Sequence, residues 1–384
     1  MTDTTASAAT CVEESECIFT LTPEQRNALL SSQDEVALDP SLVESIRGTF
    51  EKEGYVLVRG LLDEQVQRNL CKAGEELSKS TSYSPKSFSV VEFGPAFNVE
   101  EKVFRDTSLN STIPALVGKI LLGIDDTHKT PTKESILSLR LLKDAFMAKG
   151  KEEKHCGWHV DDTFFWPTNS SSAGVNVWIA LDEIPAKYGG GMAVSPRSHT
   201  AEWREKAYTT IGSIPSLPPE GITPSTISIG QTCEMASLNP EMNASIEASK
   251  LEFDYQPGDC LFCHRWLFHR SVLINEEGLA HYGNNSALKR YTVRYERSNA
   301  QLLRGLCLEP CILMNPDNTG RSLDEVCQHD GPFYPQCWPP LDNDARRDQE
   351  CEMERLAKEV LPEAQIKKGK LMADFREDKL AYGN

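Results

Sequence analysis

Apolar residues recur at helical spacing in the first third of the chain. The clearest helix opens at Asp39-Pro40, a cap followed by proline at the first helical position, and Gly54 is suited to end it. The apolar positions of this helix are Leu42, Val43, Ile46 and Phe50. A second helix is predicted after the Asp63 cap, a shorter one from Pro23 and another from Pro114. The helices at 39–54 and after Asp63 flank a short apolar strand, and we expect this unit to pack against one face of a later sheet.

From residue 136 onward the pattern changes to short β-prone segments separated by turns. The predicted strands are 136–142, 146–150, 175–181, 251–255, 260–269 and 290–295, and a Gly-rich turn at 189–191 leads to the stretch 192–199. Many short strands separated by turns predict a mainly β sandwich or jelly roll with flanking helices. Residues 200–250 lack periodicity and are rich in Pro, Ser and Glu, so we expect an insertion or long loop there, with a lid over a pocket as one reading.

Composition excludes several classes of function. The 384 residues carry a formal net charge of −17, whereas binding to nucleic acid needs a basic face. The chain has no apolar run of membrane-spanning length, and its polar N-terminus does not look like a secretory signal, so we expect a cytoplasmic protein. In that compartment the 12 cysteines are expected to be reduced thiols.

The most informative stretch for chemistry is Trp158-His159-Val160-Asp161. Residues i and i+2 of a strand share a face, so His159 and Asp161 can point into one pocket. Two histidines and one carboxylate are the ligand set of non-haem Fe(II) oxygenases. The second histidine could be His264 or His269, which both lie on or just after an apolar strand. Their odd separation would place them on opposite faces of a regular strand, so only one is expected to reach the pocket.

A cation for an acidic cosubstrate is also available. Arg290, Thr292 and Arg294 have period-2 spacing and share one face of the strand that follows. A guanidinium can hold a carboxylate through two hydrogen bonds, and a nearby hydroxyl can add a third. A zinc site is a weaker reading of Cys260 and Cys263, because they lie in an apolar strand and no second pair has suitable spacing.

Taken together, these pieces resemble the phytanoyl-CoA hydroxylase family of Fe(II)- and 2-oxoglutarate-dependent dioxygenases. The matching stretches are 50–62, Trp158-His159-Val160-Asp161, 177–182, 190–199 and the segment from Pro257-Gly258-Asp259 through His269-Arg270-Ser271 to Asn275. The resemblance implies a double-stranded β-helix, that is, a cupin-like jelly roll. We therefore expect a disordered N-terminus over residues 1–20, a dioxygenase domain over 21–300 that includes the 200–250 insertion, and a partly helical C-terminal extension over 301–384.

The resemblance also implies the site. Fe(II) would be held by His159, Asp161 and His269, with O₂ as the oxidant. Arg290 would bind the far carboxylate of 2-oxoglutarate with Ser271 as its hydroxyl helper. The stretch between Ser271 and Arg290 is longer than in the family and looks like an extended hairpin tip, so Arg294 stays open as the anchor. Trp178 and Lys149 are further candidate cofactor-binding residues by position alone.

The expected activity is hydroxylation of an unactivated C–H bond in a small-molecule substrate. An oxidative cyclase or desaturase of natural-product metabolism on the same iron site is the alternative enzyme, and a jelly-roll binding protein without turnover is the non-enzymatic one. A homo-oligomer is possible, and no nucleic-acid partner is expected.

Overall fold

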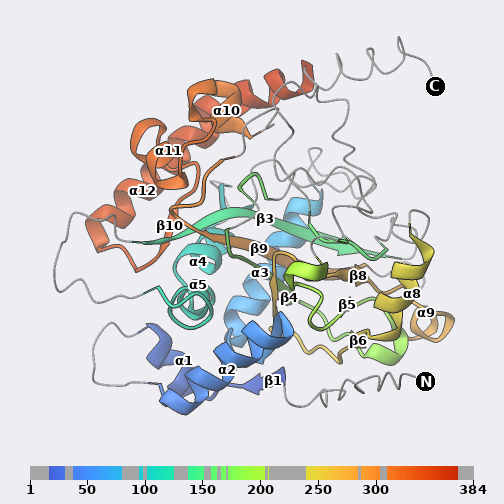
Figure 1. Cartoon of the computed structure of the whole chain (residues 1–384). Helices are drawn as coiled ribbons and strands as arrows, with labels where there is room; N and C mark the ends of the chain where they lie inside the picture. Colours follow the sequence, from blue (N-terminus) through green and yellow to red (C-terminus); the bar gives the residue numbers. More distant parts are fainter. Residues whose placement is uncertain are drawn as a thin grey trace, which may run out of the picture.

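The structure, a computed structural model, describes residues 17–30, 38–79, 95–97, 102–124, 137–150, 157–161, 166–169, 172–203, 206, 239–283, 287–302 and 309–370. Its strands form two sheets (Figure 1). The larger sheet has the order β1 (Ile18–Thr20), β2 (Tyr55–Arg59), β7 (Cys260–His264), β4 (Gly174–Ala180), β9 (Leu288–Arg297), β3 (Leu139–Lys149) and β10 (Gln336–Trp338). The smaller sheet has the order β6 (Leu251–Glu252), β5 (Met192–Val194) and β8 (His269–Ser271). Only the β1–β2 pair is parallel among the paired strands described.

The alternation of side chains separates two apolar regions. On β4, Val175, Val177 and Ile179 belong to the large core outside the barrel, whereas Trp178 and Ala180 face inward. The inner cluster joins residues of both sheets, so the two sheets enclose a common interior. The expected jelly roll with flanking helices is confirmed.

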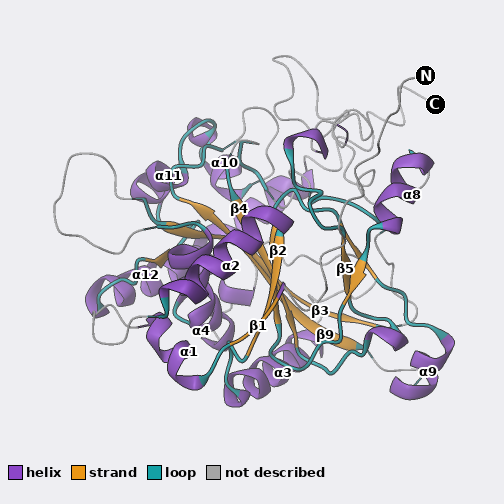
Figure 2. Ribbon diagram, turned by 60° about the horizontal axis from the view of Figure 1, so that its bottom comes forward, coloured by secondary structure: helices purple, strands orange, loops and turns teal. Residues whose placement is uncertain are grey.

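Helices cover the outer face of the larger sheet (Figure 2). Those of the N-terminal half are α1 (Pro23–Leu30), α2 (Pro40–Glu53), α3 (Glu64–Lys79), η3 (Pro95–Phe97), α4 (Lys102–Leu109), α5 (Thr112–Ala115) and the π-helix η4 (Leu116–Leu121). The expected caps are present: Asp39 accepts from the amide of Ser41, and Gly54 ends α2 with φ of 83°. Helix α5 begins two residues before the predicted start at Pro114, because Ser111 caps it.

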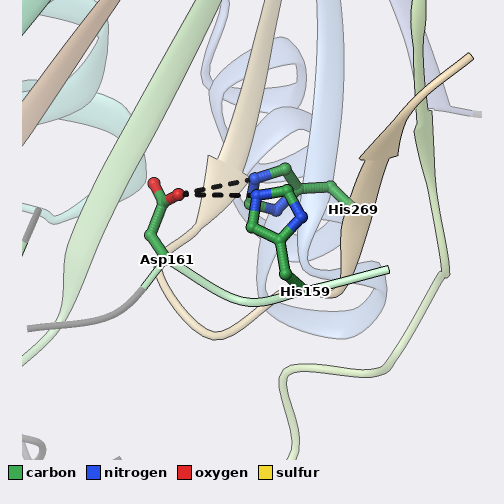
Figure 3. A group of neighbouring side chains, drawn as sticks. All are labelled: His159, Asp161 and His269. Carbon is green, nitrogen blue, oxygen red and sulfur yellow. Dashed lines mark ion pairs between the residues drawn. The ribbon is translucent and has the colours of Figure 1, made fainter. Parts of the chain in front are cut away.

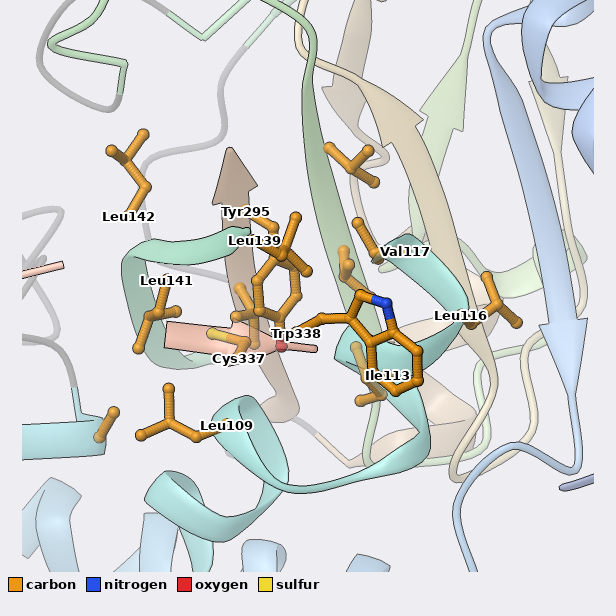
Figure 4. Close-up of a cluster of buried hydrophobic side chains, with 14 of the residues drawn as sticks. Leu109, Ile113, Leu116, Val117, Leu139, Leu141, Leu142, Tyr295, Cys337 and Trp338 are labelled. Atoms are coloured by element: carbon orange, nitrogen blue, oxygen red, sulfur yellow. The ribbon is translucent and has the colours of Figure 1, made fainter. Parts of the chain in front are cut away.

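The C-terminal region packs on the same sheet. It contains α10 (Pro310–Met314), η8 (Pro316–Asn318), α11 (Leu323–Asp330), α12 (Asn343–Arg355) and the π-helix η9 (Leu356–Val360). Strand β10 pairs with the start of β3, and Trp338 is buried against η4 (Figure 4). A Cβ on Gly118 of η4 would lie 2.4 Å from the Trp338 ring, so the glycine permits this close approach.

Several sequence-based expectations were wrong in detail. The two strands predicted at 136–142 and 146–150 are one strand, β3, whose pairing register shifts between Leu141 and Lys143. The bulge interrupts the alternation that marks a continuous strand. The expected hairpin tip after Ser271 contains helix α9 (Glu276–Tyr282), capped by Asn275.

Two expectations concern segments that the structure describes only in part. Strand β1 pairs with β2 inside the stretch expected to be disordered, whose first 16 residues lie outside the described part. The 200–250 segment ends in helix α8 (Pro240–Ala248), and residues 204–205 and 207–238 lie outside the described part. The described helices include none with the length and apolar character needed to cross a membrane.

Candidate metal centre

The segment 157–161 runs beside the start of β8. The His159 amide donates to the carbonyl of His269 at 3.1 Å, and the His269 amide donates to the carbonyl of His159 at 3.0 Å. Because neighbouring residues of extended backbone face opposite sides, Trp158 lies in an apolar cluster outside the smaller sheet while His159 and Asp161 face inward. The backbone therefore fixes both histidines at one point.

His159, Asp161 and His269 come together as a group (Figure 3). The Asp161 Oδ1 atom lies 3.9 Å from Nε2 of His159 and 3.6 Å from Nε2 of His269. The two imidazole ring centroids are 4.3 Å apart. One potential ligand atom from each residue lies within 4.8 Å of the others, so the three residues are close enough together to hold one metal ion.

Hydrogen bonds orient both imidazoles for metal binding. Nδ1 of His159 lies 2.8 Å from the carbonyl of Gly157, and Nδ1 of His269 lies 2.9 Å from the carbonyl of Leu267. A carbonyl only accepts, so each Nδ1 carries the proton and donates, which leaves the Nε2 lone pair directed at the group's centre. The donor set and its tautomers therefore fit a divalent transition metal.

Two side chains of the larger sheet donate hydrogen bonds to the second carboxylate oxygen of Asp161. Its Oδ2 atom accepts from Nε of Arg294 at 2.9 Å and from Nδ2 of Asn176 at 3.2 Å. Burial acts to raise the pKa of Asp161, but the opposing effects, of which the charge of Arg294 is the largest, hold this pKa well below its usual range. Asp161 is therefore an anion whose Oδ1 is left to face the two histidines.

Arg290 lies further along the same face of β9. Arg290 is buried, and its guanidinium carbon lies 5.8 Å from the centroid of the Trp178 ring. Burial raises the pKa of Tyr255, and the positive charge of Arg290 opposes this rise. The Tyr255 and Trp178 rings are 4.6 Å apart. An aromatic-walled interior that contains the Arg290 guanidinium is suited to bind a carboxylate attached to a short carbon chain.

The remaining predicted residues have different positions. Ser271 shares the inward face of β8 with His269 and pairs with Met192 of β5. Lys149 ends β3 opposite Leu288, and its side chain lies outside the described part.

The second candidate histidine does not join the group. Nδ1 of His264 accepts from the amide of Trp266 at 3.2 Å, and the ring is 5.1 Å from that of His199. Cys260 and Cys263 point into different apolar clusters, so they do not form half of a zinc site.

Sequence reasoning missed Asn176 and the contact between Arg294 and Asp161. A signal for Asn176 was present, since it is a polar residue two positions from Trp178 on an otherwise apolar strand. Its partner Asp161 lies on a different segment, so the pattern of β4 alone could not identify the contact.

Comparison with known proteins decides the family. The family model described as phytanoyl-CoA dioxygenase (PhyH) matches residues 50–272, which is more than half of the chain. The chain belongs to this family. The matched range contains all three residues of the candidate metal centre and ends before β9. Among curated protein sequences, none matches the chain.

Solved structures similar to this chain include two enzymes from nogalamycin biosynthesis. The non-haem alpha-ketoglutarate-dependent carbocyclase SnoK from nogalamycin biosynthesis is 18% identical, with 78% of this chain and 96% of that chain covered and a TM-score of 0.50. The epimerase SnoN is 20% identical over 71% and 90% of the two chains, with a TM-score of 0.46. EctD from S. alaskensis, solved with 2-oxoglutarate and 5-hydroxyectoine, is 12% identical over 71% and 80%, with a TM-score of 0.42. At these identities, the match to SnoK shows a shared fold.

Proposed function

We propose that this protein is an Fe(II)- and 2-oxoglutarate-dependent dioxygenase that hydroxylates an unactivated C–H bond of a small molecule. The observation that carries the proposal is the convergence of His159 Nε2, His269 Nε2 and Asp161 Oδ1 on one point. Two imidazoles and one carboxylate on one side of an ion leave its other positions open for cosubstrate and O₂. Family membership supports the same reading.

We propose Arg290 as the anchor for the far carboxylate of 2-oxoglutarate, with Ser271 as its hydroxyl partner. Arg294 directs its Nε to Asp161 and so belongs to the support of a metal ligand. Arg290 lies four residues away on the same face, about 13 Å along the strand, in the aromatic-walled interior. This division of roles favours Arg290 over Arg294. Trp178 would line the cosubstrate site, and Lys149 remains a candidate by position alone.

When bound, the iron, 2-oxoglutarate and O₂ would supply the oxidising chemistry, with succinate and CO₂ as coproducts. The residues of this chain hold and orient these groups. The backbone bridge between His159 and His269 fixes the direction of the imidazoles. Arg294 and Asn176 keep Asp161 anionic and position its Oδ1. Asp161 and His269 are buried, so their ligand atoms are shielded from bulk water.

The nature of the substrate is proposed from charge. The strongly acidic chain offers no basic cluster for the phosphates of a CoA thioester, so we propose a small molecule. Asp161 occupies the position where a halogenase would need a small residue to admit halide, which favours hydroxylation over halogenation. The cytoplasmic location remains a prediction.

The direct test is succinate formation by the full chain, purified without oxygen, loaded with Fe(II) and given 2-oxoglutarate and O₂. We expect slow turnover without substrate in the wild type and none in His159→Ala. His281→Ala is the matched control, because His281 is an exposed histidine on α9.

Equal succinate formation by wild type and His159→Ala would contradict the proposal. Loss of turnover in His281→Ala as well would show that the effect is unspecific. Binding of Fe(II) and 2-oxoglutarate without turnover in any condition, including a screen of small-molecule substrates, would favour the alternative of a jelly-roll binding protein.

A further inference from the structure

Helix α8 covers the outer side of the two segments that carry the candidate metal-binding histidines (Figure 1). Its buried residues Met242 and Ile246 belong to one apolar cluster with Trp158 and Phe268. Trp158 immediately precedes His159, and Phe268 immediately precedes His269. The helix therefore contacts the backs of both segments, opposite the side on which the histidines meet.

One carboxylate of α8 connects these segments by polar contacts. Glu247 Oε2 accepts from Nε1 of Trp158 at 2.7 Å and from Nε of Arg270 at 3.1 Å, and Glu247 Oε1 accepts from Nη2 of Arg270 at 3.0 Å. The Arg270 guanidinium carbon also lies 5.3 Å from the centroid of the Trp158 ring. A two-point contact between a carboxylate and a guanidinium is geometrically specific.

The partners of Glu247 are the sequence neighbours of both histidines. Trp158 precedes His159, and Arg270 follows His269. Since successive residues of a strand face opposite sides, a shift of Trp158 or Arg270 on the outer side moves the adjacent histidine on the inner side. The Glu247 carboxylate can thus affect the positions of both imidazoles through Trp158 and Arg270.

We propose that Glu247 is a positioning residue that sets the separation of His159 and His269 and thereby the affinity of the metal centre. The inference rests on the proposed metal site and extends it to α8, which ends the 200–250 insertion. The effect acts through Trp158 and Arg270, since Glu247 reaches neither histidine by the contacts described.

The Glu247 carboxylate is ionised at neutral pH. We call its contacts with Trp158 and Arg270 the clamp. Burial acts to raise the pKa of Glu247, but hydrogen bonds from Lys250, Arg270 and Trp158 outweigh it and lower this pKa to about 2. Lys250 Nζ lies 2.7 Å from Oε1 and adds a second positive partner. The clamp therefore persists throughout the neutral range.

The test is Co(II) binding by the metal-free full chain, measured for wild type, Glu247→Gln and Arg270→Gln. Partners of metal ligands change affinity by roughly 10- to 100-fold, and Glu247 is one step further out, so we expect about tenfold weaker binding in Glu247→Gln. In a variant that carries both Glu247→Gln and Arg270→Gln, the losses of Co(II) affinity caused by the two substitutions should not add, because each removes the same clamp. Glu241→Gln removes the same charge from an exposed position of α8 and is the matched control.

A second readout needs no metal. Amide hydrogen exchange over 157–161 and 267–271 should be faster in metal-free Glu247→Gln than in wild type, because the bridge between His159 and His269 loses its support. Urea unfolding of each variant shows whether the protein remains folded and whether stability changes. A residue that only stabilises the fold would alter the unfolding midpoint and leave the Co(II) dissociation constant of the folded protein unchanged.

Co(II) binding within twofold of wild type and unchanged exchange in Glu247→Gln would overturn the inference while leaving the metal centre intact. An equal loss in Glu241→Gln would also overturn it, since the effect would then follow the charge of the helix. If wild type itself bound no Co(II), the proposed function would fail and the inference with it. Weaker binding and faster exchange confined to the Glu247 and Arg270 variants would support it.

Discussion

Asp144 of β3 is a buried carboxyl group whose protonation should govern how stability varies with pH. Its Oδ2 atom accepts from the Tyr291 hydroxyl at 2.5 Å and from the amide of Ala96 at 2.8 Å. Burial raises its pKa from 3.8 to about 7, although these hydrogen bonds and the charge of Arg294 oppose the rise. We consider the substitution Asp144→Asn, which keeps an oxygen that can accept both bonds and removes the ionisation.

The direction follows from proton linkage. Between pH 3.8 and about 7 the folded protein keeps the Asp144 proton and the unfolded chain loses it, so the contribution of Asp144 to stability is full below 3.8 and is lost as pH rises to about 7. A tenfold change in an equilibrium constant corresponds to about 1.4 kcal/mol, so the loss over this range is on the order of 4 kcal/mol. Asp144→Asn should not lose this stability, because the asparagine side chain does not ionise.

The assay is urea unfolding of the metal-free full chain at pH 5 and pH 8. Other titrating groups cancel when wild type and variant are compared at the same pH. Asp144→Asn should gain stability relative to wild type from pH 5 to pH 8, by roughly 2–4 kcal/mol. The exposed Asp106→Asn should show no such gain. A difference between Asp144→Asn and wild type that is constant with pH would refute the reasoning.

Three further substitutions test other contacts. Arg294→Gln removes the positive charge beside Asp161 and should weaken Co(II) binding by roughly 10- to 100-fold, and an unchanged dissociation constant would be incompatible with the support assigned to Arg294. Arg290→Gln should weaken 2-oxoglutarate binding at least tenfold while Co(II) affinity stays within about threefold, as isothermal titration can show, and 2-oxoglutarate binding that stays unchanged in this variant would favour Arg294 as the anchor. Arg197→Gly relieves a non-glycine φ of 62° but takes a guanidinium from the buried Glu53, so urea unfolding should show a loss of about 1–2 kcal/mol, and a more stable variant would contradict this balance.

Local patterns predicted the parts of the fold that depend on local physics. The caps at Asp39 and Gly54 marked α2 because they satisfy the backbone groups at its ends. Period-2 spacing placed His159 and Asp161 on one face, since the alternation of extended backbone needs no knowledge of the rest of the molecule. The choice of His269 over His264 came from the resemblance to a family, because spacing alone left both open.

The failures share a different cause. Asn176 and Glu247 act on residues 15 and 89 positions away, and no local pattern reports such contacts. Helix α9 was missed because its residues were interpreted as part of a turn, although Asn275 is a suitable cap. Strand β1 has only three residues and takes its order from pairing with β2, so its own sequence carries little signal.

The central claim is that His159, Asp161 and His269 hold Fe(II) together with 2-oxoglutarate. The most direct measurement is the absorption spectrum of the oxygen-free protein as Fe(II) and then 2-oxoglutarate are added. The account predicts an Fe(II)-dependent charge-transfer band in wild type and in His281→Ala, and none in His269→Ala. Absence of the band in wild type, or a band of equal strength in His269→Ala, would contradict it.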